Sequence, residues 1–243
     1  MHIIAIVQAR MGSTRLPGKV MKDIGGTSML ARVVSRLARS ELIDLILVAT
    51  TTKRSDDPIV VECDRLKVPV FRGDEEDVLD RYYNAALAHG ADAVVRITSD
   101  CPLIEPEVVD KVIRAFLEGN PDYASNSLER TYPRGLDAEV VSMEALTRTW
   151  EEATASYQRV HVTPYIYQNP DCFNLIPVKS DVDYSHYRWT VDTQEDLDFV
   201  REVYSRFGDD DSFTWKDLLS LLAKEPELVE INSHILKKSL EEG

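Results

Sequence analysis

A run of basic and loop-forming residues follows the first apolar segment of the chain. Residues 3–7 read as a strand, and the sequence Arg10-Met-Gly-Ser-Thr-Arg-Leu-Pro-Gly-Lys19 begins shortly after it. Backbone N–H groups freed by glycines can bind phosphate oxygens, and arginine and lysine add charge-assisted hydrogen bonds. Three cations at one strand end, Arg10, Arg15 and Lys19, therefore predict a triphosphate site rather than a solvated turn.

This basic loop matches neither of two common nucleotide-binding fingerprints. Gly12 and Gly18 enclose five residues, where a Walker A loop has four. Val20 stands where that motif requires Ser or Thr. The sequence also has no G-x-G-x-x-G pattern of the dinucleotide-binding type. A P-loop kinase and a dinucleotide-binding protein are therefore both disfavoured.

Two aspartates farther along the chain could hold a metal ion. Asp100 and Asp192 each follow a short strand-like run. Magnesium prefers one or two carboxylates together with phosphate oxygens and waters, so this pair predicts a Mg²⁺ site beside the triphosphate. Asp192 has an alternative role as the N-cap of the following helix, with Thr193 as a rival cap and Glu195 completing a capping box.

The hydrophobic pattern indicates the elements that position these residues. In the first half of the chain, β-branched runs alternate with helical patterns, which is typical of parallel strands covered by helices on both faces. The expected strands are residues 3–7, 45–49, 68–71 and 93–97, and the expected helices are residues 29–39, 58–66, 78–88 and 108–117. Open α/β sheets bind ligands at the carboxyl ends of their strands, where the basic loop and Asp100 lie. The predicted fold class is α/β, a Rossmann-like, mostly parallel sheet flanked by helices.

The alternation breaks from about residue 120 to 187, where we expect a small α+β insertion. Within it, residues 138–141 and 172–178 are strand-like, and residues 143–153 and 156–167 are helical. Helical spacing returns in residues 195–207 and 215–222, and residues 237–243 are expected to be a solvated end. A chain of 243 residues fits one domain, residues 1–243, that carries this insertion.

Composition narrows the environment and the partners. The net charge of −14 opposes binding to nucleic acid or to anionic lipid, because the long-range field repels polyanions. The three cysteines stand far apart and suggest neither a zinc site nor a disulfide framework, so a reducing cytoplasm is expected. No apolar stretch is long enough to span a membrane.

Three segments together resemble a known family. The basic loop, Arg-Ile-Thr-Ser-Asp-Cys-Pro-Leu-Ile around Asp100 and Arg-Trp-Thr-Val-Asp-Thr-Gln-Glu-Asp-Leu around Asp192 are similar to the spore-coat polysaccharide cytidylyltransferases. A more distant similarity links them to the 3-deoxy-manno-octulosonate and acylneuraminate cytidylyltransferases. The resemblance covers residues 1 to about 205. It implies the nucleotide-diphospho-sugar transferase type of fold, CTP as substrate, and Mg²⁺ on Asp100 and Asp192.

The resemblance also implies roles for individual residues. Arg10, Lys19, Asp100 and Asp192 would be catalytic. The nucleotide would be bound by Gln8, Ala9, Arg10, Gly12, Ser13, Arg15, Lys19 and Ser99, with the base near Thr50, Thr51 and Arg72. The acceptor would be bound by Asn126, Arg134, Asp137, Glu139 and His161. One departure falls in the part expected to bind the acceptor, because Arg159-Val160-His161 stands where relatives commonly carry Arg-Glu-His.

The predicted activity is transfer of CMP from CTP to a small acidic or sugar-like acceptor, with release of pyrophosphate. A homodimer formed through residues 120–187 is implied by the resemblance. A metal-dependent glycosyltransferase would need a D-x-D pair at a strand end, whereas Asp181-Val-Asp183 lies in a polar segment that predicts a surface loop. Uridylyl transfer, guanylyl transfer and an inactive nucleotide-binding scaffold are also compatible with the sequence. His161, taken alone, is equally compatible with an ordinary helix-start or core histidine.

Overall fold

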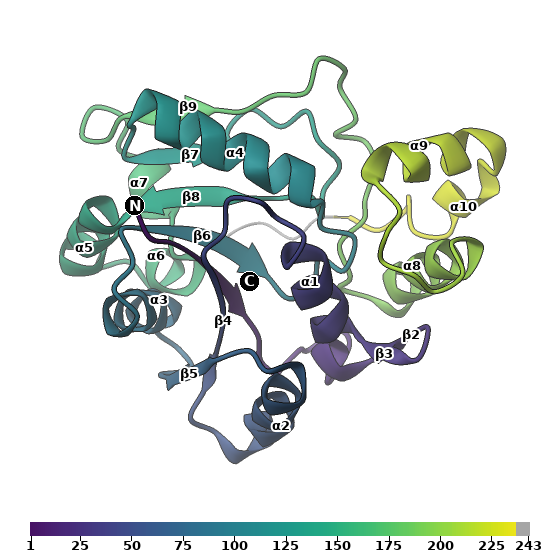
Figure 1. Cartoon of the computed structure of the whole chain (residues 1–243), viewed down its shortest axis with the longest axis horizontal. Helices are drawn as coiled ribbons and strands as arrows, with labels where there is room; N and C mark the ends of the chain where they lie inside the picture. The colour runs from purple at the N-terminus through teal and green to yellow at the C-terminus, as the bar shows by residue number, and fades with distance from the viewer. Residues whose placement is uncertain (237–243) are drawn as a thin grey trace.

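A computed structural model describes residues 1–236 and shows one seven-stranded sheet at its centre (Figure 1). The strand order is β5 (Val70–Gly73), β4 (Leu45–Thr51), β1 (Ile3–Gln8), β6 (Ala93–Thr98), β8 (Glu139–Ser142), β7 (Tyr123–Ser125) and β9 (Leu175–Pro177). The first four strands are parallel, β8 is antiparallel to both of its neighbours, and β9 pairs in parallel with β7. The predicted α/β class with a mostly parallel sheet is confirmed.

Helices cover both faces of this sheet, because successive side chains of a strand point to opposite sides. Ala5 and Val7 of β1 pack in one core with the helices α1 (Met29–Leu37), α2 (Asp57–Leu66) and α4 (Pro106–Gly119). Ile4 and Ile6 pack in a second core with the helices α3 (Val78–Ala88), α5 (Met143–Glu152) and the short α7 (Pro164–Tyr167), and α6 (Ser156–His161) lies against α3. Burial of β1 on both faces explains its continuous apolar sequence.

A third core lies beside the sheet, at the right of Figure 1. It is built by α8 (Gln194–Arg206), α9 (Trp215–Lys224) and α10 (Glu227–Glu230) around the fully buried Trp189. Gly135 approaches this part so closely that an added Cβ would lie 2.6 Å from the carbonyl carbon of Trp189. Its φ of +106° also requires glycine. The backbone of the insertion is thereby fitted against the segment that leads to Asp192.

The remaining short elements border the basic loop. They are the 3-10 turns η1 (Lys19–Met21) and η2 (Arg54–Asp56) and the hairpin of β2 (Asp23–Ile24) and β3 (Thr27–Ser28). Within residues 1–236, no helix is both long and apolar enough to cross a membrane. The solvated end predicted for residues 237–243 lies outside the described residues.

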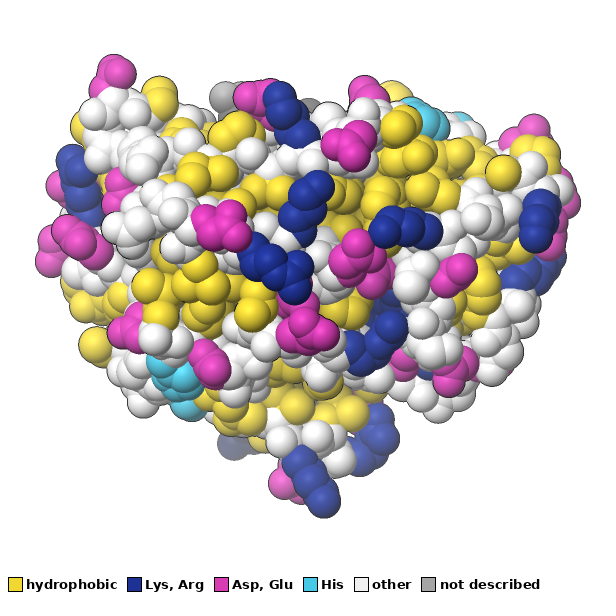
Figure 2. Space-filling model, turned by 45° about the horizontal axis from the view of Figure 1, so that its top comes forward, with side chains coloured by type: hydrophobic (Ala, Val, Ile, Leu, Met, Phe, Trp, Pro, Cys, Tyr) yellow, Lys and Arg dark blue, Asp and Glu magenta, His cyan; other side chains and the backbone are white. Residues whose placement is uncertain are grey.

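Acidic and basic side chains are interspersed on the face shown in Figure 2, with apolar surface between them. Asp181 and Asp183 are exposed in a bend, as predicted, and not at a strand end. On the face in view, the excess of acidic residues is therefore spread among cations rather than gathered into one block.

Two expected elements are wrong. The helix predicted for residues 156–167 is broken at Val162, where φ is +73° and ψ is −57° and the N–H of Thr163 donates to the His161 carbonyl at 2.9 Å, forming a γ-turn. Pro164 accounts for the break, because proline cannot donate to a continuing helix and restricts the residue before it. The strand-like run before Asp192 forms only an isolated bridge between Arg134 and Arg188.

Candidate active site

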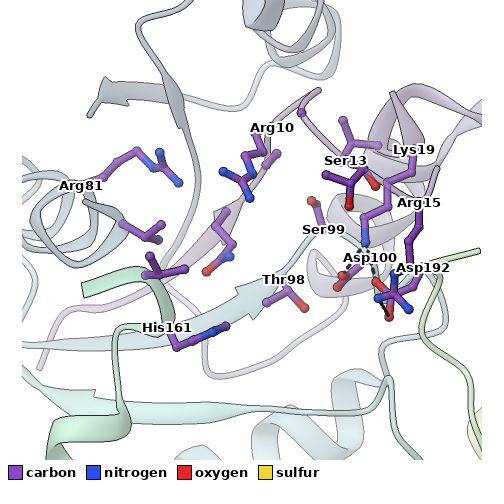
Figure 3. Close-up of a pocket in the computed structure, with 17 residues that line it drawn as sticks. Arg10, Ser13, Arg15, Lys19, Arg81, Thr98, Ser99, Asp100, His161 and Asp192 are labelled. Atoms are coloured by element: carbon purple, nitrogen blue, oxygen red, sulfur yellow. Dashed lines mark hydrogen bonds and ion pairs between the residues drawn. The ribbon is translucent and has the colours of Figure 1, made fainter. Parts of the chain in front are cut away.

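A cavity of about 540 Å³ opens at the carboxyl ends of β1 and β6 (Figure 3). The parallel register places Gln8 beside Thr98, so the basic loop and the segment that leads to Asp100 leave the sheet side by side. The cavity is lined by Gln8, Ala9, Arg10, Gly12, Ser13, Thr14, Arg15, Lys19, Val20, Val78, Arg81, Thr98, Ser99, Asp100, Val160, His161 and Asp192. The structure thus brings the basic loop and both predicted metal-binding carboxylates into one cavity.

Lys19 lies between the two aspartates. Its Nζ donates to Asp100 Oδ2 at 2.8 Å, to Asp192 Oδ1 at 2.9 Å and to the Val191 carbonyl at 2.9 Å. The loop turns into this position at Gly18, whose φ of +66° favours glycine. The Gly18 N–H donates to the Met11 carbonyl at 3.1 Å, which closes the loop on itself.

Mutual attraction controls the charges of this cluster. Burial would lower the pKa of Lys19 and raise that of each aspartate, because a charged form is disfavoured away from water. The opposite charges outweigh burial, so the pKa of Lys19 is raised and the pKa values of Asp100 and Asp192 are lowered. All three side chains are therefore charged at neutral pH.

Asp192 is held by residues that the sequence reasoning missed. Arg188 donates to Asp192 Oδ2 at 3.0 Å and to both oxygens of Asp196 at 2.8 Å. Asp196, which is fully buried, also accepts from the Asp192 N–H at 2.9 Å. Arg15 approaches Asp192 Oδ2 at 3.1 Å from the other side. Asp192 is therefore fixed by contacts on both sides, with its second oxygen on Lys19.

The helix cap next to Asp192 corrects one expectation. Thr193 is the N-cap of α8, and Asp196, not Glu195, completes the capping box. The reason is position: Asp196 is the third residue of the helix, so its carboxylate reaches back to the Thr193 N–H at 3.1 Å. Because Thr193 caps the helix, the Asp192 carboxylate faces the cavity.

The two aspartates fit a Mg²⁺ ion. Both carboxylates bind the same ammonium nitrogen, so both lie within reach of a single cation. Within residues 1–236, no cluster of three or more His, Cys, Asp or Glu side chains is arranged to hold a metal. Two carboxylates with phosphate oxygens and waters as the further ligands are the arrangement that Mg²⁺ prefers.

Arg81 is a cavity residue that the sequence reasoning also missed. It lies on α3, three residues after Val78, so both side chains share the helix face that lines the cavity. Its guanidinium points toward that of Arg10 in Figure 3. The signal in the sequence is the pair of a valine and an arginine at helical spacing just after the third strand, and it is weak.

A second hollow of about 320 Å³ adjoins the cavity and shares His161 with it. Its other lining residues are Arg96, Ser127, Leu128, Arg130, Glu139, Thr163 and Tyr167. The Glu139 carboxylate is fully engaged: it pairs with Arg96 and accepts from the Tyr123 hydroxyl at 2.7 Å and the Thr163 hydroxyl at 2.5 Å. Glu139 therefore shapes the wall of this hollow.

The three residues expected at the base do not line the cavity. Thr50 and Thr51 are fully buried, and the Thr51 hydroxyl donates to Asp56. All of the Arg72 guanidinium nitrogens are committed: Nε to the Thr51 carbonyl at 2.8 Å, and the other two to Asp57 at 2.8 Å and the Lys53 carbonyl at 2.7 Å. β5 is the edge strand of the sheet, and the contacts of Arg72 with Lys53 and Asp57 join its end to the neighbouring η2 and α2.

Three of the residues expected at the acceptor also lie outside both hollows. The buried Asn126 side chain donates to the Leu136 carbonyl at 2.7 Å and accepts from the Ala138 N–H at 2.9 Å. Asp137 pairs with Arg130 at 2.5 Å. The Arg134 backbone donates to Tyr187 at 3.0 Å and accepts from Trp189 at 2.7 Å. These residues support the walls, and Arg130 is the arginine that reaches the second hollow.

Val160, the departure from the relatives' Arg-Glu-His, lines the first cavity and not the second. The sequence places this departure in the acceptor part. Its position on α6, which packs against α3 through an ion pair of Arg159 with Asp77 at 2.6 Å, puts it at the cavity that contains the basic loop.

Comparisons with known proteins agree with this geometry. A family model described as cytidylyltransferase matches residues 4–229. The chain is 40% identical over 244 residues to an uncharacterized protein of Methanocaldococcus jannaschii, covering 100% of this chain and 99% of that protein. It is 33% identical over 236 residues to the spore coat polysaccharide biosynthesis protein SpsF of Bacillus subtilis, covering 93% of this chain and 95% of that protein.

Among solved structures, a cytidylyltransferase from Leptospira borgpetersenii has a TM-score of 0.92 and 33% sequence identity to this chain. The match covers 98% of this chain and 100% of that one. The resemblance inferred from the three sequence segments is thus confirmed over almost the whole chain. The protein belongs to the cytidylyltransferase family.

Proposed function

We propose that the protein is a Mg²⁺-dependent cytidylyltransferase. It transfers CMP from CTP to a small acidic or sugar-like acceptor and releases pyrophosphate, in the biosynthesis of a surface polysaccharide or glycoconjugate. We also propose that it works as a homodimer in the cytoplasm. The observation that carries the activity is the placement of Asp100, Asp192 and the cations of the basic loop in one cavity at the carboxyl edge of the sheet.

Positioning of the reacting groups and neutralisation of charge supply most of the catalysis in such a reaction. Arg10, Arg15 and Lys19 can hold the phosphates and neutralise the departing pyrophosphate, which lowers the barrier to its release. Asp100 and Asp192 would hold Mg²⁺, which polarises phosphate oxygens and favours attack on the α-phosphorus. The contacts of Arg188 and Asp196 fix Asp192 before any substrate arrives. Fixed groups need little reorganisation during the reaction.

The second hollow is the proposed acceptor pocket. His161 lies at its junction with the first cavity, where an acceptor oxygen must approach the α-phosphorus. Arg130 and Arg96 lie in its walls, each paired with one carboxylate, Asp137 and Glu139, and Ser127 and Tyr167 bring hydroxyl groups. Such a lining suits an acceptor that combines an acidic group with hydroxyls. It supports a sugar acid or another acidic polyol rather than an apolar acceptor.

Nucleotide binding gives the first test. CTP with Mg²⁺ should raise the melting temperature more than ATP, GTP or UTP at equal concentration, because a ligand that prefers the folded state stabilises it. A larger shift with UTP or GTP would support uridylyl or guanylyl transfer. No shift with any nucleotide would revive the inactive scaffold. The second test is release of pyrophosphate from CTP in the presence of candidate sugar acids, which a glycosyltransferase would not produce.

A further inference from the structure

Arg81 is a buried cation without an acidic partner. The residue is 2% exposed. Its Nη1 donates to the Asp74 carbonyl at 2.7 Å, its Nε has no hydrogen-bond partner, and no carboxylate in residues 1–236 forms an ion pair with it. Burial is the main cause that lowers its pKa, and the nearby Arg10 lowers it further. Nη2 donates to no group within residues 1–236 and, unlike Nε, it is not sealed from solvent, so it can donate to a ligand.

A ligand that accepts from Arg81 would lie in the cavity, because Arg81 lines it and points toward Arg10 (Figure 3). The two ends of this cavity differ in chemistry. Lys19, Asp100 and Asp192 occupy one end, which suits phosphates and a cation. Arg81 lies at the opposite end in Figure 3.

The wall at the Arg81 end carries apolar side chains. Val78 shares the cavity-facing side of α3 with Arg81, and Val160 reaches the cavity from the adjoining α6. Val160 stands where relatives commonly carry a glutamate, so this wall is uncharged here. Apolar walls with one polar group are typical of the part of a site that holds a flat, uncharged ring. If the phosphates lie at the Lys19 end and the acceptor lies beyond His161, the nucleoside must occupy the Arg81 end of the cavity.

We propose that Arg81 reads the base, donating hydrogen bonds from its guanidinium to the O2 and N3 edge of cytosine. The proposal rests on the proposed function and names the residue that gives it base selectivity. A guanidinium can only donate. Cytosine presents acceptors at both O2 and N3. Uracil carries a hydrogen on N3, so its N3–H would face a guanidinium N–H and no hydrogen bond could form there. Arg81 therefore favours CTP over UTP, in the role that sequence reasoning gave to Arg72.

The experiment measures binding of CTP, UTP and inorganic pyrophosphate by calorimetry in the presence of Mg²⁺. The proteins are the wild type, Arg81→Lys, Arg81→Gln and Arg72→Lys. Both Arg81 variants should lower the CTP-to-UTP affinity ratio by about tenfold or more, through weaker CTP binding. Pyrophosphate affinity should stay unchanged. Arg72→Lys should keep the wild-type ratio, because its guanidinium is bound to the protein.

A modified nucleotide tests the same contact in the unaltered protein. CTP in which a carbon replaces N3 lacks one acceptor, so it should bind the wild type about tenfold more weakly than CTP. In Arg81→Lys this difference should largely disappear. Equal affinity of the wild type for both nucleotides would overturn the proposal. So would a wild-type CTP-to-UTP ratio in both Arg81 variants, or an equal loss of CTP, UTP and pyrophosphate binding, which would mark Arg81 as a phosphate ligand.

Failure of the proposed function would look different. A wild-type protein that binds none of the nucleotides would contradict the cytidylyltransferase assignment and, with it, the role of Arg81. A protein that prefers CTP but owes the preference to Arg72, so that Arg72→Lys alone lowers the ratio, would keep the assignment and overturn only the role of Arg81.

Discussion

Replacing Lys19 by methionine tests whether Asp100 and Asp192 form a cation site. In the substrate-free protein the Lys19 ammonium separates two carboxylates, and it accounts for hydrogen bonds of 2.8 to 2.9 Å to three acceptors. Methionine has a similar length but no charge, so the carboxylates lose their shared partner. We therefore expect Lys19→Met to lower the melting temperature in the absence of metal.

The size of this effect follows from the burial of the cluster. Breaking a fully buried ion pair costs about 3–5 kcal/mol. The side chains of Lys19, Asp100 and Asp192 are 14%, 24% and 23% exposed, so water screens part of the interaction. We expect a loss of about 2 kcal/mol. For a chain of this length, that corresponds to roughly 4–8 °C in melting temperature.

Excess Mg²⁺ should reverse the loss. In the variant the ion meets two carboxylates that have lost the ammonium between them, whereas in the wild type it must displace that ammonium. Binding at about one hundred times the dissociation constant stabilises a protein by about 2.7 kcal/mol, enough to restore the melting temperature. The wild type should respond less to Mg²⁺ without nucleotide. Melting curves in EDTA and in Mg²⁺ measure both effects.

A lysine outside the cavity is the matched control. Lys179 is half-exposed and pairs with Glu129, so Lys179→Met should change neither the stability nor the response to Mg²⁺ by much. Adding Asp100→Asn to Lys19→Met should abolish the rescue by metal. A Lys19→Met variant that melts like the wild type, or equal stabilisation of the single and the double variant by Mg²⁺, would refute a cation site at Asp100 and Asp192.

Three further predictions concern catalysis, support of the site and assembly. Asp100→Asn and Asp192→Asn should each reduce pyrophosphate release more than a hundredfold, about 3 kcal/mol, with little loss of fold, and near wild-type turnover would refute the metal assignment. Asp196→Asn should destabilise the protein by about 3 kcal/mol at pH 7, because the buried ion pair with Arg188 is lost. The fold lowers the pKa of Asp196, so the ionised carboxylate stabilises the protein above its unfolded pKa of about 4, and this stabilisation disappears as the pH falls below that value. Urea unfolding should therefore show a smaller difference in stability between variant and wild type at acid pH than at pH 7. Light scattering at micromolar concentration should give the mass of a homodimer, and a monomer would contradict the role expected for residues 120–187.

The sheet and the meeting of the basic loop with Asp100 could be predicted from sequence because both depend on local signals. Apolar runs and helical spacing mark the strands and helices, and parallel strands bring their carboxyl ends to one edge. That rule alone places the loop of Lys19 beside Asp100. The shape of the basic loop also depends on local signals, such as the glycine at position 18 with its positive φ.

The contacts of side chains across the fold were not predictable in the same way. Arg72 stands at a strand end, as a base-binding residue should, but β5 is an edge strand and its guanidinium turns to the neighbouring backbone. Arg81 reaches the cavity because α3 packs across the second face of the sheet, and its helical spacing from Val78 does not by itself reveal that packing. The support of Asp192 by Arg188 likewise depends on a bridge to the insertion rather than on a strand.

The γ-turn at Val162 links stability to function. A β-branched residue at φ +73° is held in a conformation that costs on the order of 1–3 kcal/mol. The turn directly follows His161, the residue shared by both hollows, so the backbone that orients this side chain is also the backbone that is strained. Glycine at position 162 would relieve this strain, but it would also remove a side chain that is buried in the second core, so it would not make the protein more stable. Burial of the Val162 side chain therefore holds the strained turn, and with it the end of α6 beside His161, in one conformation.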